Sequence, residues 1–164
     1  MIVRGEKMER EKALKEFWKE STKLVSIMSE FDGEQHLYGD NLMYQIEGSV
    51  IDLIAENPGI NITEISAEIR RTISACSKFI KKFVDNGWVE QTRNPYNKRV
   101  FNLSLTPEGM EVYNARRVFN EKCQQIIYNN LSEFSVEDIE KYTQINRALN
   151  NACMEITKKF RIEK

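Results

Sequence analysis

The sequence predicts a mainly α chain with one small β-hairpin, an α+β arrangement, and three observations support this. Only 7 Gly and 3 Pro interrupt 164 residues, so long uninterrupted elements are expected, and helices form these more readily than strands. Apolar residues recur at helical spacing over most of the chain, and strand-like patterns stand out only at residues 88–105. With 41% hydrophobic and 30% charged residues, the composition suits one domain, or one small module with helical extensions.

A long helix followed by a loop is predicted at the N-terminus. Between about residues 9 and 31, apolar residues such as Leu14 and Ile27 form a stripe with charged residues between them. Residues 33–40 have turn residues at both ends and no sustained period, so we expect a loop there. His36 is expected to be a surface residue of that loop.

Three shorter helices are predicted in the middle of the chain. The first covers about residues 42–56 and stops before Pro58, because proline cannot continue a helix. The second begins at Asn61, an N-cap with an acidic residue three positions later. Thr72 caps the third helix, which ends at Gly87. The third helix is expected to turn its apolar positions toward the core, namely Cys76, Ile80, Phe83 and Val84.

A hairpin and two long helices complete the predicted chain. Residues 88–94 and 100–105 are expected to form two strands, joined by a turn with basic residues on both sides. Thr106 then caps a helix that reaches about residue 131, and Ser135 caps a last helix that reaches about residue 160. We expect the apolar stripe of the last helix to face inward. The apolar faces of both helices and of the N-terminal helix are expected to cover one another across the two-fold axis of a homodimer.

The formal net charge of −1 conceals an uneven distribution along the chain. Residues 32–69 hold eight Asp or Glu and no Lys or Arg, a local charge of −8. Residues 70–99 hold eight Lys or Arg against Asp85 and Glu90, a local charge of +6. Such a basic segment is typical of a surface that binds phosphate backbones, although a merely solvated face would give the same count.

The order of these elements predicts a winged helix-turn-helix. A short helix, a tight connection and a second helix with a polar, basic exposed side are followed by a hairpin with a basic turn. A helix of this size fits the major groove, and a basic hairpin beside it can follow the backbone or enter the negative minor groove.

Four segments also resemble the MarR family of bacterial transcriptional regulators. They are residues 58–65 (PGINITEI), 77–90 (SKFIKKFVDNGWVE), 93–99 (RNPYNKR) and 103–109 (LSLTPEG). The resemblance implies a homodimer on double-stranded DNA, with recognition helices in successive major grooves of a pseudo-palindromic operator. It also implies release of the DNA by a small-molecule or redox signal.

The chain departs from the family pattern at several positions. The wing carries Asn94 and Asn97 where the family usually has acidic residues that orient an arginine. Arg70 and Arg71 stand where the family usually has a glycine, and Ile73 stands where a polar or basic residue is common.

The candidate DNA-binding residues come from the basic segment and from matching motif positions. Ser74, Ser77 and Lys78 are the candidate contacts to base edges, and Arg99 is the candidate wing arginine for the minor groove. The complete candidate set is Arg71, Thr72, Ser74, Ser77, Lys78, Lys81, Lys82, Arg93, Lys98 and Arg99.

The predicted organisation has three parts. Residues 1–41 form an N-terminal helix and loop within a dimerisation region, residues 42–105 form the winged helix-turn-helix, and residues 106–164 form C-terminal dimerisation helices. The predicted function is a sequence-specific transcriptional repressor that an effector releases from DNA. The alternatives are a winged-helix module that binds protein without DNA, and a thiol-based redox-sensing regulator.

Other function classes find little support in the sequence. There is no nucleophile motif, glycine-rich phosphate loop or HExxH motif, so we expect no enzyme. No apolar run approaches a membrane span and the first residues lead into alternating charges, so a cytoplasmic protein without a membrane partner is expected. His36 has no Cys or carboxylate partner at metal spacing, so neither a metal nor another cofactor is expected.

The cysteines and some aromatic residues leave two interpretations open. Cys76, Cys123 and Cys153 are expected to be packed, reduced thiols, and the alternative is that one of them senses redox state. Four aromatic residues are expected to belong to the core, with an effector pocket as the alternative: Phe17, Trp18, Tyr38 and Tyr44.

Overall fold

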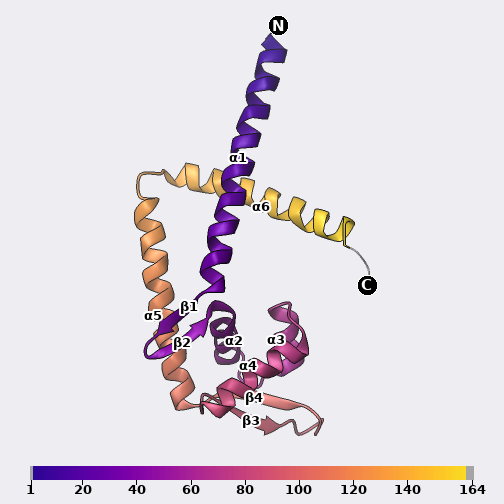
Figure 1. The fold of residues 1–164 in the computed structure, drawn as a ribbon, viewed down its shortest axis with the longest axis vertical. Coiled ribbons are helices and arrows are strands. Elements are labelled where there is room, and N and C mark those ends of the chain that lie inside the picture. The colour runs from indigo at the N-terminus through magenta and orange to yellow at the C-terminus, as the bar shows by residue number, and fades with distance from the viewer. Residues whose placement is uncertain (1, 162–164) are drawn as a thin grey trace. The chain divides into compact units, whose positions relative to one another are not determined.

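The computed structural model describes residues 2–161, with side chains from residue 5 onward, and is mainly helical (Figure 1). This confirms the predicted fold class, although the described chain has two small antiparallel hairpins where one was predicted. The elements are α1 (Ile2–Gly33), β1 (Gln35–Tyr38), β2 (Asn41–Tyr44), α2 (Gln45–Glu56), α3 (Ile62–Glu68), α4 (Ile73–Asp85), β3 (Val89–Arg93), β4 (Phe101–Leu105), α5 (Pro107–Asn130) and α6 (Val136–Lys159).

The loop predicted at residues 33–40 is wrong, because β1 and β2 form a hairpin there. Tyr38 pairs with Asn41, so the turn consists of two residues, Gly39 and Asp40. Gly39 has φ +61°, a left-handed conformation that the tight turn needs and that glycine adopts at little cost. Strands of four residues are too short to show a sustained period in the sequence.

His36 is therefore a strand residue and not part of a surface loop. Its ring is half-buried, with its centroid 4.1 Å from that of Phe31 and 5.5 Å from that of Phe119. Its Nε2 lies 2.8 Å from the carbonyl oxygen of Phe31. The hairpin thus joins the end of α1 to α5 through an aromatic cluster.

Helix α2 begins at Gln45, later than the predicted residue 42, because the residues before it belong to β2. The Tyr44 backbone N–H donates to Glu47 Oε2 at 3.0 Å, which satisfies one of the free N–H groups at the helix start. The helix ends before Pro58, as predicted.

The hydrophobic core lies in the first of two compact units, which ends at Phe119; the second begins at Asn120. The core is formed by α2, α3, α4, both hairpins and the first turns of α5. Its buried members are Tyr38, Met43, Val50, Ile51, Ile54, Ile60, Ile65, Cys76, Ile80, Phe83, Val89, Leu103 and Val112.

Both predicted caps of the helix-turn-helix are confirmed. Asn61 Oδ1 accepts from the backbone N–H groups of Thr63 (2.9 Å) and Glu64 (3.2 Å), and Glu64 Oε2 accepts from Asn61 N–H in return. Thr72 Oγ1 accepts from Ala75 N–H at 3.2 Å. Between the two helices Arg70 has φ +51°, so a bulky residue holds the left-handed conformation in this tight connection.

The second hairpin and the start of α5 are tightly joined. β3 and β4 pair antiparallel, and the β-bridge from Ile60 to Leu103 attaches the hairpin to the chain before α3. Thr106 caps α5 as predicted, because its Oγ1 accepts from Gly109 N–H at 3.0 Å. A Cβ on Gly109 would lie 2.0 Å from the Trp88 carbonyl oxygen, so only glycine fits there without movement.

The second unit consists of the last part of α5 and helix α6. Ser135 caps α6 as predicted: its Oγ accepts from Asp138 N–H at 3.1 Å, and its N–H donates to Asp138 Oδ2. The Ser135 hydroxyl also donates to Asp138 Oδ2, and this bond, together with the one from the Ser135 N–H, lowers the pKa of Asp138. The predicted inward stripe of α6 is exposed within the single chain, and the covering of these faces by a second copy stays a prediction. The exposed side chains are Ile139, Tyr142, Ile145, Ile156 and Phe160.

Within the described residues, no helix is both long enough and apolar enough to cross a bilayer.

Candidate nucleic-acid interface

Helix α4 has one buried face and one exposed polar face. Cys76, Ile80 and Phe83 are buried as predicted, whereas Val84 is 38% exposed and does not belong to the core. Ser74, Ser77, Lys78 and Lys81 all lie on the exposed side. The helix therefore presents small hydroxyl and ammonium groups, which can donate to base edges and phosphates in a major groove.

The two lysines near the end of α4 have different surroundings. Lys81 forms a solvent-exposed ion pair with Asp85 one turn later, at 2.9 Å. Lys82 Nζ contacts both carboxylate oxygens of Glu47 on α2, at 2.9 Å and 3.0 Å. The side chain of Glu47 is only 7% exposed, so Lys82 neutralises a buried charge and ties α4 to α2.

A buried cation, Arg116, was not foreseen from the sequence. Arg116 of α5 donates through Nε to Asp52 Oδ2 at 2.8 Å, and through Nη1 to Gln45 Oε1 at 2.8 Å and to the Tyr38 hydroxyl at 3.2 Å. Its guanidinium lies against Gly48, where a Cβ would collide with Nη1. Arg116 therefore holds α5, α2 and the first hairpin together.

Two asparagines organise the turn between β3 and β4, which is the wing. Asn94 Oδ1 accepts from the backbone N–H groups of Tyr96 (2.9 Å) and Asn97 (3.0 Å), while its Nδ2 donates to Asn102 Oδ1. Asn97 Oδ1 accepts from the backbone N–H of Arg99 at 3.1 Å. These residues therefore order the backbone of the turn and do not hold the arginine side chain.

The three basic residues of the wing differ in whether their side chains have partners within the chain. Arg93 Nη1 donates to the Lys98 carbonyl oxygen at 2.9 Å, and its guanidinium lies 5.3 Å from the Phe101 ring centroid. Lys98 and Arg99 are exposed. Within the described chain, the Arg99 side chain has no hydrogen bond or ion pair to orient it.

Two hollows connect α4 with the wing. One holds about 350 Å³ and is lined by residues of α3, α4 and β3: Ile62, Ser77, Ile80, Lys81, Val84, Asp85 and Gln91. The other holds about 190 Å³ and is lined by Asn61, Ile62, Thr63, Ile80, Gln91, Arg99, Val100, Phe101 and Leu103. Ser77 and Lys81 thus border the same concave surface that leads to Arg99. The remaining candidates, Arg71 and Thr72, lie at the start of α4 and are exposed.

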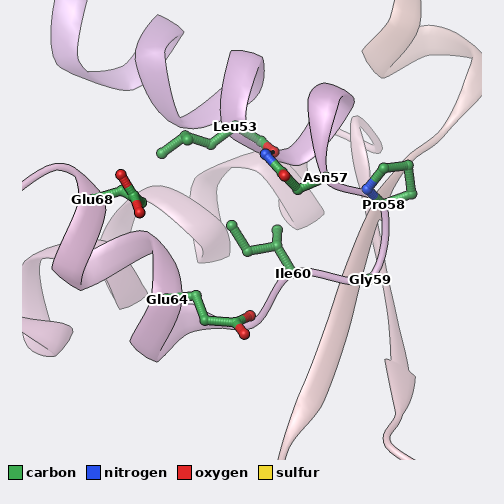
Figure 2. Close-up of a pocket in the computed structure, with 7 residues that line it drawn as sticks. All are labelled: Leu53, Asn57, Pro58, Gly59, Ile60, Glu64 and Glu68. Atoms are coloured by element: carbon green, nitrogen blue, oxygen red, sulfur yellow. Dashed lines mark hydrogen bonds between the residues drawn. The ribbon is translucent and has the colours of Figure 1, made fainter.

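A larger cleft of about 710 Å³ lies between α2 and α3 and has the opposite charge (Figure 2). Leu53 and Ile60 form its apolar part, and the carboxylates of Glu64 and Glu68 line its α3 side. The two carboxylates would repel phosphate, so this cleft is not part of the candidate interface.

The cysteines and the aromatic residues follow the predicted core roles only in part. Cys76 is buried, and this burial raises the pKa of its thiol, as expected for a packed cysteine. Cys153 is exposed, which contradicts the predicted packing at that position. Tyr38 is fully buried as core, whereas Trp18 and Tyr44 are exposed. In the part of the chain that the structure describes, no group of three or more His, Cys, Asp or Glu side chains could hold a metal ion.

Comparison with known proteins agrees with this geometry. Residues 44–101 match the model of the MarR family. The chain is 23% identical over 90 residues to YhjH of Bacillus subtilis, an uncharacterized HTH-type transcriptional regulator. This match covers 55% of the chain, which spans about half (51%) of the length of that relative.

Solved structures share the fold at low sequence identity. FabT of Streptococcus pneumoniae, in complex with DNA, has a TM-score of 0.64 at 18% identity, over 88% of this chain and 98% of FabT. ZitR of Lactococcus lactis, a zinc-responsive MarR family member, has a TM-score of 0.70 at 15% identity, over 85% of this chain and 98% of ZitR. These likenesses confirm the winged helix-turn-helix fold.

Proposed function

We propose that the chain, whose residues 44–101 match the model of the MarR family, is a sequence-specific, DNA-binding transcriptional regulator. The observation that carries the proposal is the continuous surface from the exposed face of α4 to the wing. Ser77, Lys81 and Arg99 border this surface, where Asp85 is paired with Lys81. The carboxylates of α3 line a different cleft. The positive charge and the donors of the surface match a phosphate backbone and the edges of base pairs.

The candidate residues take three roles in this proposal. Ser74, Ser77 and Lys78 contact base edges in the major groove, and Arg99 enters the minor groove. Arg71, Lys81 and Lys98 contact phosphates. Thr72 caps α4, Lys82 is paired with the buried Glu47, and Arg93 donates to the Lys98 carbonyl oxygen, so we assign these three to positioning α4 and the wing.

The proposed active form is a homodimer. The long helices expose apolar side chains that a soluble chain normally covers, including Leu24 at 50% and Ile145 at 50% exposure. We propose that residues 1–41 and 106–164 form the dimer, and that residues 42–105 bind one half-site in each subunit. The half-site centres then lie about 34 Å apart, one turn of DNA, and an effector releases the repressor.

Selection of bound sequences from a pool of random DNA duplexes tests the proposal, combined with the salt dependence of the affinity. A regulator should recover a pseudo-palindrome, and its affinity should fall steeply with salt because phosphate contacts release counterions. Recovery of no common sequence, with an affinity for duplexes that is independent of salt, would contradict the proposal. That outcome would favour the alternative, a winged-helix module that binds protein.

A further inference from the structure

We propose that Tyr96, on the turn of the wing, is a second minor-groove contact and that it sets a preference for A·T pairs beside Arg99. This inference rests on the proposed function, because it names a specificity-determining residue of the same interface. In Figure 1 the β3–β4 hairpin projects from the first unit with its turn at the free end.

The exposure of Tyr96 is the first observation. Its side chain is 97% exposed, the highest value among the large hydrophobic residues of the described chain. Both the ring and the hydroxyl are therefore accessible to a partner at the end of the hairpin, and an aromatic residue with a polar tip suits a contact that is part apolar and part hydrogen-bonded.

The second observation is that the turn is ordered before any DNA arrives. Asn94 Oδ1 accepts from the N–H groups of Tyr96 and Asn97, and Asn94 itself is fixed by Asn102. Pro95 restricts φ just before Tyr96. The backbone therefore loses little conformational entropy on binding, which favours affinity at this position.

The chemistry of the phenol selects the ligand. An A·T pair presents only the acceptors A N3 and T O2 in the minor groove, whereas G·C adds an amino donor. The Tyr96 hydroxyl can donate to those acceptors, and the ring can lie along the apolar faces of the deoxyriboses. Because the phenol is neutral, its contribution should not depend on salt, in contrast to that of Arg99.

The experiment compares full-length parent, Tyr96→Phe, Tyr96→Ala and Arg99→Ala in selection from a random duplex pool, followed by affinity measurements over a range of salt. Tyr44→Phe, an exposed tyrosine of the first unit outside the candidate DNA-binding residues and the proposed dimer segments, is the matched control. All of these side chains are exposed, so the variants should fold like the parent.

We expect Tyr96→Phe to lose about fivefold in affinity at each half-site, the effect of one hydrogen bond, and therefore about 25-fold for the selected duplex as a dimer. The A·T preference should relax at one position in each half-site. Its salt slope should equal that of the parent, whereas the slope of Arg99→Ala should fall by about one for each subunit.

Three outcomes would overturn the inference. If the parent selects a sequence and both Tyr96 variants select the same one with affinity within twofold, Tyr96 makes no contact and the proposed function stands. If only Tyr96→Ala binds more weakly, and equally so for all sequences, the ring contacts the backbone without base preference. If the parent itself selects no sequence, the proposed function fails and this inference fails with it.

Discussion

Removing the charge of Lys82 should destabilise the fold without changing the electrostatics of DNA binding. Lys82→Met keeps the alkyl stem and leaves the Glu47 carboxylate without its cation. The Glu47 side chain is 7% exposed and that of Lys82 is 36% exposed, so water replaces the lost partner only in part. Glu47 keeps its bond from Tyr44 N–H, which limits the loss.

The expected loss in the free energy of unfolding of Lys82→Met lies between two known limits. Exposed ion pairs contribute about 0.5 kcal/mol, and removing one partner of a fully buried pair costs about 3–5 kcal/mol. Because one partner is buried and the other is about one-third exposed, we expect the free energy of unfolding to fall by about 2 kcal/mol. With a urea m-value of about 2 kcal/mol/M, the midpoint should move down by about 1 M.

The assay is urea unfolding at fixed protomer concentration, as a double-mutant cycle of Lys82→Met, Glu47→Gln and the double variant. We expect a coupling of about 1–2 kcal/mol. Lys81→Met is the matched control, because its ion pair is exposed and its removal should change stability by less than about 0.5 kcal/mol. A coupling near zero, or a reduced salt slope of DNA binding for Lys82→Met, would refute the assignment of Lys82 to the fold.

Three further predictions concern backbone geometry and the thiols. Gly109→Ala should lower the free energy of unfolding by about 2–4 kcal/mol, because its Cβ must displace the Trp88 carbonyl; urea unfolding would measure this, and a gain in stability would contradict the close approach. Arg70→Gly should change the free energy of unfolding by less than about 0.5 kcal/mol in the same assay. Glycine adopts the left-handed conformation at this position without strain, which stabilises the folded state, but it also makes the unfolded chain more flexible, and the two effects offset each other. The pKa of the Cys76 thiol is raised in the folded state, so the folded protein holds this proton more tightly than the unfolded chain does. The thiol therefore contributes to stability below its ordinary pKa, and this contribution is lost as the pH rises through the raised pKa. Thiol titration at pH 8 should label Cys153 at once and Cys76 only as the protein opens, and equal rates would contradict the burial.

The parts of the fold that depend on local interactions were predictable. The caps at Asn61, Thr72 and Ser135 each use a side chain and backbone N–H groups within three residues, so the sequence alone specifies them. The polar face of α4 followed from helical spacing in the same way. The edge between the polar and buried faces of α4 was less predictable, because Val84 falls at the helical spacing of the buried residues and is nevertheless exposed.

The parts that depend on distant residues were not predictable. Glu47 pairs with Lys82, and Asp52 pairs with Arg116, across sequence distances that no local pattern connects. The hairpin of β1 and β2 left one usable signal: Gly39 and the residue after it form a two-residue turn between short apolar segments. A glycine-containing turn without a strand pattern on both sides is also typical of a loop, so this signal alone does not predict a hairpin.

The contact between Gly48 and Arg116 constrains how this chain can change over evolutionary time. Glycine inside a helix costs about 1 kcal/mol relative to alanine, so drift would ordinarily replace it. Here the missing side chain is the space that the guanidinium occupies, and alanine would collide with it. The two positions are therefore coupled: replacing the glycine first places a Cβ against the guanidinium, and losing the arginine first leaves Asp52 without its partner.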